Sequence, residues 1–184
     1  DKFLKKSTVL PAKWGVKIAD VDFKVYGIRI IPFTDSAIFI NDRSFRGEVD
    51  ILRQQDETLL VVNRINVEDY LRGVLYHEVS HWWPSATLQA QAIASRTFAL
   101  YQAKVNKGKD YDLECSVISQ VYGGATSERL RANEAVYKTI GKALTYEGRL
   151  FPAYFHATCA GRTEAASVLW KDDLRPLRGV VCNF

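Results

Sequence analysis

The sequence predicts an α+β protein, in which a β-rich N-terminal part packs on a helical core with a returning β-hairpin. Before residue 66, apolar residues alternate with polar ones at period two, as in half-buried strands. After residue 66 they recur at helical spacing, and strand-like runs return after residue 143. A composition of 47% hydrophobic and 25% charged residues is ordinary for a globular chain of 184 residues. It excludes disordered, collagen-like, coiled-coil and disulfide-scaffold classes, and no apolar run approaches the ~20 residues of a membrane span.

The N-terminal part is expected to consist of strands and to act as a support. Runs rich in Val, Ile and Phe cover residues 16–32 and 37–40, and period-two alternation continues over residues 45–53. Residues 58–65 form a further strand run, separated from the previous one by a turn-like Gln-Asp-Glu at 55–57. These two runs therefore predict a hairpin. No cluster of potentially catalytic side chains occurs in this part.

A helix is predicted to begin after Asn66, which is a favourable N-cap. Glu68 and Asp69 in its first turn complement the helix dipole, and apolar side chains then follow at helical spacing. The helix should end before Trp82, because two bulky indoles and a proline follow. We divide the chain at this point into a β-rich part, residues 1–65, and a core, residues 66–184, with residues 45–65 continuous with the core.

The core should contain two more helices and a closing pair of strands. The first is Ala-rich, begins near residue 84 or 85 and ends near residue 104, and small residues all around it predict burial on several sides. The second covers residues 127–140 and is stopped by Gly141. Residues 143–148 and 150–161 then form strands.

The net charge, the cysteines and the lack of Met bear on the partners and the processing of the protein. The net charge of +4 is mild and its positive residues are largely scattered, so no nucleic-acid partner is predicted. Cys115, Cys159 and Cys182 contain no C-x-x-C motif; they could form one disulfide and one thiol, or three thiols. Because the sequence contains no Met, we expect that its start was processed or trimmed.

His77, Glu78 and His81 form an H-E-x-x-H pattern, which on a helix can bind zinc and activate water. The context is poor, because Pro84 and the indoles follow at once and no extended motif exists. Loose candidates for a third zinc ligand are Glu114, Glu128, Glu134 and His156. A zinc protease is therefore the less favoured alternative; otherwise both histidines flank a glutamate that matters for another reason.

Glu78 and Arg96 form a second candidate pair. An arginine among small residues of a buried helix requires a partner, and Glu78 precedes that helix. The pair is either a structural ion pair or a cleft carboxyl group oriented by Arg96. A direct arginine contact would lower the pKa of Glu78 and oppose general-acid chemistry unless burial raised it again.

The segment 154–164 is a third candidate, because aromatic and hydrogen-bonding side chains alternate along it before a glycine. It could line a sugar-binding groove, or it could be a core strand followed by a turn. His156, Gln120 and Tyr122 carry the same two interpretations.

Several separated segments together resemble the SpoIID/LytB family of bacterial cell-wall proteins, which comprises stage II sporulation protein D and amidase enhancers. The similarity runs in order from about residue 45 to about residue 180. The segments that carry it are residues 66–75, Glu78, Trp83-Pro84, residues 88–100, residues 120–124, Gly141, residues 144–148, residues 153–156 and residues 161–164.

The resemblance implies a peptidoglycan lytic transglycosylase that cuts glycan strands stripped of stem peptides and leaves 1,6-anhydro-N-acetylmuramic acid ends. It implies Glu78 as the catalytic acid and maps the family's helix arginine to Arg96, which we expect to be the second catalytic residue. Its remaining motif positions map to Gln120, Tyr122, His156 and Arg162, which we expect to bind substrate. It also implies an extracytoplasmic location and a partner amidase, and we expect no cofactor and no bound metal.

A single carboxyl group suits this reaction, whereas ordinary glycosidases use two. The alternative from the same resemblance is a non-catalytic wall-binding module that enhances an amidase. The chain departs from relatives in having Val79 after the glutamate, Ser119 in place of a cysteine, and Cys159-Ala160 in place of Ser-Gly. With Cys115 as the only corresponding ligand, a family-type zinc site is not expected. In an oxidising compartment, Cys159 or Cys115 could pair with Cys182.

Overall fold

The computed structural model describes residues 6–34, 36–156, 158–170 and 172–182. The chain forms two compact units, Asp1–Asn66 and Val67–Phe184. The first unit contains strands and the second contains the α-helices, so the predicted α+β class is confirmed. None of the helices in the described part of the chain combines the length and apolar character that crossing a bilayer requires.

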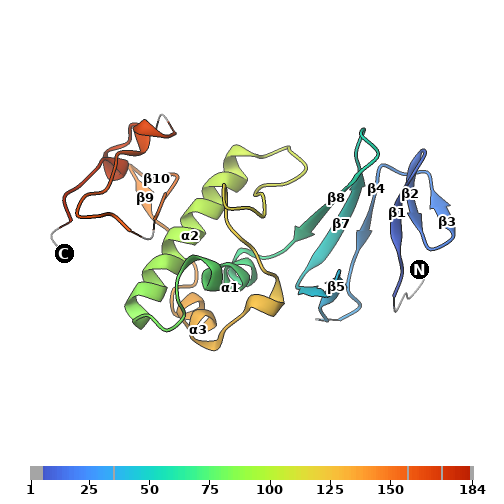
Figure 1. Ribbon diagram of the computed structural model, residues 1–184, viewed down its shortest axis with the longest axis horizontal. Helices are drawn as coiled ribbons and strands as arrows, with labels where there is room; N and C mark the ends of the chain where they lie inside the picture. The colour runs from blue at the N-terminus through green and yellow to red at the C-terminus, as the bar shows by residue number, and fades with distance from the viewer. Residues whose placement is uncertain (1–5, 35, 157, 171, 183–184) are drawn as a thin grey trace. The chain divides into compact units, whose positions relative to one another are not determined.

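The first unit is built from short antiparallel sheets (Figure 1). One contains the strands β1 Val9–Ala12, β2 Gly15–Ile18 and β3 Val21–Phe23 in that order. The next contains β4 Gly27–Ile30, β7 Glu48–Arg53 and β8 Leu59–Arg64, and β5 Ile38–Ile40 pairs with β6 Arg43–Phe45. Strand β2 contacts both β4 and β7, and the fully buried Val16 and Val49 lie on these elements.

The predicted hairpin over residues 45–65 is confirmed. Strands β7 and β8 pair from Glu48↔Arg64 to Arg53↔Leu59. The connection is closed by the Gln54 N–H, which donates to the Thr58 carbonyl at 2.9 Å, while Asp56 Oδ1 accepts from the Thr58 N–H at 3.1 Å. This use of a short acidic side chain to stabilise a turn is typical of Asp.

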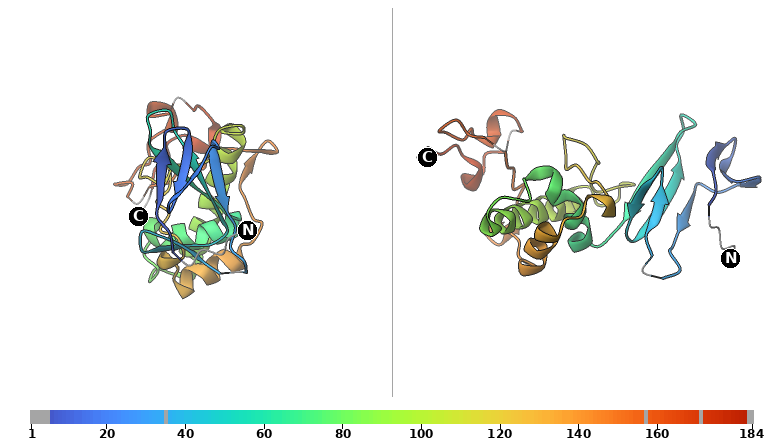
Figure 2. Two further views of the ribbon diagram at one scale, coloured as in Figure 1. Left: turned by 90° about the vertical axis from the view of Figure 1, so that its right-hand side faces the viewer. Right: turned by 60° about the horizontal axis from the view of Figure 1, so that its bottom comes forward.

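The second unit is organised around three α-helices in the described residues: α1 Val67–Glu78, α2 Ser85–Val105 and α3 Leu130–Lys138. They contact one another pairwise, and Figure 2 shows α1 and α3 beside the long α2. Leu71, Val74 and Leu75 of α1 are buried, as their spacing predicts. Helix α2 buries residues on several faces, which confirms the prediction from its small side chains.

The third helix begins later than predicted. A 3₁₀ turn, η1 Ala125–Ser127, is followed by extended backbone at Glu128 and Arg129 before α3 begins. The Ser127 hydroxyl forms a hydrogen bond with His77 Nε2 of α1 at 2.8 Å. Ser127 is therefore held by a contact with another helix and lies outside α3.

The returning hairpin exists, but its strands are only β9 Thr145–Tyr146 and β10 Arg149–Leu150. The prediction of a strand over residues 150–161 is wrong beyond Leu150 among the described residues, and Ala157 lies outside them. The Tyr154 N–H donates to the Pro152 carbonyl at 2.8 Å, which closes a tight turn. The Tyr154 ring stacks on Trp170 at 4.1 Å, so side-chain packing rather than strand pairing fixes this segment. Two further 3₁₀ turns, η2 Ala166–Val168 and η3 Arg175–Leu177, follow.

Candidate functional site

Glu78 is the last residue of α1 and is half-buried. The Val79 N–H still donates to the Leu75 carbonyl at 3.1 Å, and the chain then turns, with the Trp83 N–H donating to the Ser80 carbonyl at 3.0 Å. The helix therefore fixes the backbone of Glu78, and the loop that follows the helix begins directly after this residue. The sequence predicted this helix end, and the structure places it at Glu78.

Burial raises the pKa of Glu78 above its ordinary value, and the Val121 N–H, which hydrogen-bonds to the carboxylate, partly offsets the increase. Burial and a neutral backbone donor, rather than a neighbouring charged side chain, are the causes that set this pKa. Glu78 is therefore a carboxyl group whose proton is retained to higher pH than in water. Such a carboxyl group can act as a general acid.

Residues 120–124, which supply the Val121 N–H, pack closely against α1 at Gly73. A Cβ atom at Gly73 would lie 2.5 Å from Tyr122 Cε2 and 2.8 Å from the Gly124 carbonyl oxygen. The Gly73 carbonyl accepts the Gly123 N–H at 3.0 Å. Glycine in α1 thus permits a backbone approach that a larger residue would block, and this approach aligns residues 120–124 with the helix.

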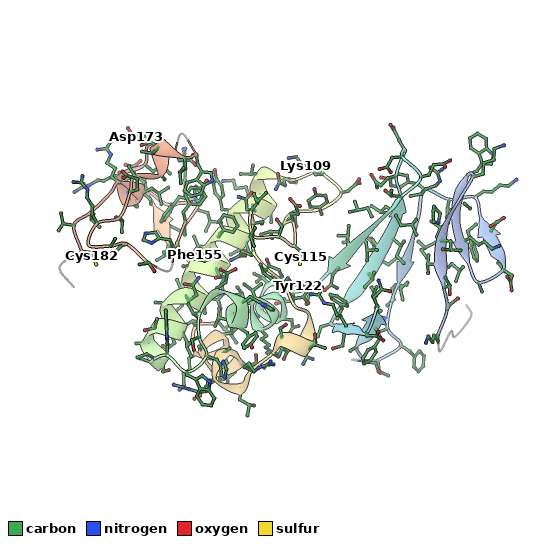
Figure 3. The ribbon with its side chains drawn as sticks, viewed as in Figure 1. Lys109, Cys115, Tyr122, Phe155, Asp173 and Cys182 are labelled. Atoms are coloured by element: carbon green, nitrogen blue, oxygen red, sulfur yellow. The ribbon has the colours of Figure 1, made fainter. Side chains whose placement is uncertain are left out.

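Gln120 and Tyr122 flank Val121 and are buried, with 1% and 7% of their surfaces exposed. The Tyr70 hydroxyl donates to Gln120 Oε1 at 3.1 Å, and the Tyr70 and Tyr122 rings lie 5.1 Å apart. Burial raises the pKa of Tyr70, so its hydroxyl remains a donor. Cys115 and Tyr122, both labelled in Figure 3, belong to the loop after α2, where the Cys115 thiol donates to the Tyr122 carbonyl at 3.1 Å. These contacts fix the loop around Val121.

The proposed pairing of Arg96 with Glu78 is wrong, because Arg96 pairs with Glu68. Arg96 Nε and Nη2 donate to the two Glu68 carboxylate oxygens at 2.9 and 2.7 Å. Arg96 Nη1 donates to the Lys142 carbonyl at 3.0 Å, and the side chain is 1% exposed. The same Glu68 carboxylate accepts the Gly141 N–H at 3.2 Å. The sequence analysis explains Glu68 by the helix dipole alone. An acidic residue in the first turn of the preceding helix was also a possible partner for Arg96.

The H-E-x-x-H pattern does not lie on one continuous helix, because α1 ends at Glu78 and His81 follows in the turn. His77 Nε2 bonds to Ser127, and the His81 ring lies 4.7 Å from the Trp82 ring. Of the loose third-ligand candidates, Glu128 accepts a hydrogen bond from Asn133 and Glu134 pairs with Lys138. Within the described residues, no three His, Cys, Asp or Glu side chains are grouped to hold a metal ion. The arrangement therefore lacks the geometry of a helical two-histidine site.

His156 and Arg162 are exposed and make their described contacts within their own region. His156 Nδ1 lies 3.0 Å from the Thr158 carbonyl oxygen. The Arg162 N–H donates to the Cys159 carbonyl at 2.9 Å, and Arg162 pairs with Val181 in an isolated antiparallel bridge. The structure thus joins Glu78 with the segment around Val121, while no described contact joins it to His156 or Arg162.

Near Glu78 in the chain, the structure brings together aromatic rings whose contacts the sequence did not predict. The Tyr76 ring lies 5.5 Å from the His81 ring, which in turn contacts Trp82, and the Arg129 guanidinium lies 4.3 Å from the Tyr76 ring centre. Tyr76 and Trp82 are exposed. The tryptophans were interpreted only as helix breakers, although their position next to a candidate acid was a usable signal.

The three cysteines, all within the described residues, form no disulfide. Cys115 bonds to the Tyr122 carbonyl, so it belongs with the Val121 loop. The Cys159 sulfur accepts a hydrogen bond from the Gly161 N–H and forms a second hydrogen bond with the Cys182 side chain. These two hydrogen bonds lower the pKa of Cys159. Of the two expected pairings, the structure brings together Cys159 and Cys182, as thiols.

Comparison with known proteins gives a consistent family. The sequence profile of the SpoIID family, described as Stage II sporulation protein, matches residues 55–146. A protein of Brachyspira hyodysenteriae (strain ATCC 49526 / WA1), named only as uncharacterised, is 34% identical over 179 residues, which cover 95% of this chain and 48% of that protein. The amidase enhancer of Bacillus subtilis (strain 168) is 32% identical over 104 residues, covering 56% of this chain and 14% of the enhancer. Stage II sporulation protein D of the same strain is 30% identical over 134 residues, covering 65% of this chain and 39% of that protein.

The chain thus spans less than half the length of each of these relatives, at 48%, 14% and 39%. The matched residues 55–146 include Glu78, the Glu68–Arg96 ion pair and the loop around Val121, whereas His156 and Arg162 lie beyond them. Because this match covers half of the 184 residues and includes the buried site just described, the chain belongs to the SpoIID family.

Proposed function

We propose that the protein is a lytic transglycosylase that cleaves peptidoglycan glycan strands with Glu78 as its single general acid and base. Membership of the SpoIID family supports a role at the cell wall. The observation that carries the enzymatic proposal is the environment of Glu78, which is half-buried, has a raised pKa and is hydrogen-bonded by the Val121 N–H. Arg96 does not oppose this role, because its guanidinium is bound by Glu68.

The reaction requires one carboxyl group and no water. Protonated Glu78 donates its proton to the oxygen that leaves C1 of N-acetylmuramic acid, and the bond between C1 and that oxygen breaks. The Glu78 carboxylate then takes the proton from the 6-hydroxyl of the same sugar while O6 bonds to C1. This closes the 1,6-anhydro ring and restores the protonated acid. Burial and a backbone donor are the causes that set the pKa of Glu78, and the one-carboxyl mechanism requires no second carboxylate, unlike ordinary glycosidases.

The other predicted residues then take different roles. Gln120, Tyr122 and Arg96 are positioning residues, because their buried side chains fix the Val121 loop and the α1–α2 contact rather than offering surface to a sugar. The exposed rings of Tyr76 and Trp82, which are two and four residues from Glu78 along the chain, are proposed as flat apolar faces for sugar rings. His156 and Arg162 are proposed as substrate contacts from family resemblance alone. The substrate implies an extracytoplasmic location, and a strand stripped of stem peptides implies a partner amidase.

The proposal is tested by incubating wild-type and Glu78→Gln protein with amidase-treated sacculi and analysing released saccharides by mass spectrometry. We expect anhydro-ended saccharides from the wild type, and a rate about 10²–10⁴-fold lower or undetectable from Glu78→Gln. The matched control is Glu134→Gln, which removes an exposed carboxyl group of α3 outside the site. The proposal fails if the wild type releases no such product, or if Glu78→Gln is as active as the control.

A non-catalytic function is the second candidate, because one relative is named an amidase enhancer. In that case the protein would bind wall material and raise the activity of a separate amidase. The two candidates separate in an amidase assay, because an enhancer acts equally well with Glu78→Gln. An enhancer also produces no anhydro ends by itself.

A further inference from the structure

An open groove with a volume of about 560 Å³ occurs within the first unit, which contains none of the residues assigned to the reaction. Its lining comes from three connections: Trp14 lies between β1 and β2, Tyr26 between β3 and β4, and Gln54 and Gln55 between β7 and β8. The volume lies in the range of small-molecule and saccharide sites. Turns that meet at a groove can therefore present several kinds of side chain to one ligand.

Two aromatic rings dominate the groove. Trp14 is 73% exposed, and Tyr26 is also exposed. The ammonium group of Lys13 lies 5.7 Å from the centre of the Trp14 ring. Large apolar side chains left in water at one groove, and rimmed by polar groups, mark a binding surface more often than an isolated exposed residue does.

The polar lining includes a donor that lacks a partner. Gln54 Nε2 is buried and forms no hydrogen bond with any described residue. A buried amide donor without an acceptor costs about 1–3 kcal/mol, and turning the Gln54 amide toward the groove, where a ligand oxygen can accept from it, would remove that cost. The groove wall is fixed, because Arg53 donates to the Ala12 carbonyl at 2.6 Å and to the Gln54 carbonyl at 2.7 Å. The guanidinium of Arg53 therefore links two of the turns.

We propose that this groove is a second glycan-binding site, which holds an N-acetylated wall saccharide independently of Glu78. The flat faces of Trp14 and Tyr26 suit the C–H faces of pyranose rings, and the amides of Gln54 and Gln55 suit hydroxyl and N-acetyl oxygens. Val25 is the single large aliphatic side chain of the lining, which disfavours an apolar peptide anchor. Of the charged lining residues, Lys13 and Arg53 are positive and Glu57 is negative, and Arg53 pairs with Glu57 at 3.5 Å, so the groove lacks the cationic stripe of a nucleic-acid site. The inference rests on the wall-glycan part of the proposed function and not on catalysis.

The test uses the four tryptophans of the full chain, whose indole N–H signals can be followed by nuclear magnetic resonance. The Trp14 signal is assigned by its absence in Trp14→Ala, and a soluble oligomer of N-acetylglucosamine is the probe. We expect a saturable shift of the Trp14 signal with the wild type. With Gln54→Leu we expect about 3–10-fold weaker binding at that signal, the effect of losing one hydrogen bond. The matched control is Phe39→Ala, because Phe39 is also 73% exposed in the first unit but does not line the groove.

A Trp14 signal that stays unmoved while the other indole signals shift would overturn the inference, because the saccharide would then bind elsewhere. It would also be overturned by an absence of any shift, by equal weakening in Phe39→Ala and Gln54→Leu, or by a stem peptide that moves the Trp14 signal when the saccharide does not. None of these outcomes depends on product release. The groove and the proposed reaction can therefore fail separately.

Discussion

Glu78 differs from an exposed glutamate in what surrounds its carboxyl group. Burial raises its pKa, and the opposing hydrogen bond comes from a neutral backbone N–H rather than from a cation. An arginine at this position would hold the carboxylate ionised, which would remove the proton that a leaving sugar oxygen requires. The pairing of Arg96 with Glu68 leaves Glu78 able to act as an acid.

The same raised pKa predicts a pH-dependent effect on stability. The folded chain keeps the Glu78 proton above 4.5, the ordinary pKa, where the unfolded chain has lost it. The free energy of unfolding therefore falls as pH rises from 4.5 through the raised pKa. Glu78→Gln should be more stable than the wild type at about pH 7, and the difference should vanish by about pH 4. Urea unfolding at both pH values measures this. Lower stability of Glu78→Gln at about pH 7 would contradict the environment described here.

At the scale of elements, the site depends on two contacts of α1. Near its start, Glu68 binds Arg96 of α2, and near its middle Gly73 admits the 120–124 loop. The first contact fixes the helix pair, and the second brings the Val121 N–H to Glu78. Each contact can be tested separately.

Removing the partner of Arg96 should be costly. Glu68→Ala leaves a guanidinium buried without its counter-charge, and we expect unfolding to become easier by about 3–5 kcal/mol. Combining Glu68→Leu with Arg96→Met removes both charges and should recover much of that loss. Denaturant unfolding gives both values. The decline of kcat/KM at high pH reports the pKa of Glu78, and in the double variant its midpoint should stay at the wild-type value. If Arg96 were paired with Glu78, removing the arginine would raise that pKa and move the midpoint upward.

Gly73→Ala should uncouple the loop from the helix. The added methyl group meets Tyr122 and the Gly124 backbone, and overpacking of this kind costs about 1–3 kcal/mol. Because the loop carries the Val121 N–H, product release should fall more than stability alone explains. Ala132→Gly in α3 provides a control of similar stability loss away from Glu78. Equal activities of the two variants would show that the loop's position does not matter.

At the scale of the whole molecule, local patterns predicted the elements better than they predicted the contacts between them. Periodicity and capping predicted α1, α2 and the β7–β8 hairpin because those elements are set by neighbouring residues. The start of α3 and the segment after Leu150 were mispredicted, because Ser127 bonds to His77 and Tyr154 packs on Trp170. Arg96 was correctly expected to need an acidic partner, but two glutamates of α1 were available and sequence proximity favoured the wrong one.

In the proposed reaction, Glu78 closes a ring on the sugar and does not activate water. The most direct measurement is digestion of amidase-treated glycan strands in water enriched in the heavy oxygen isotope, followed by mass spectrometry of the new ends. We expect anhydro ends without the heavy isotope from the wild type, and no such ends from Glu78→Gln. New reducing ends that carry the heavy isotope would show hydrolysis and contradict it.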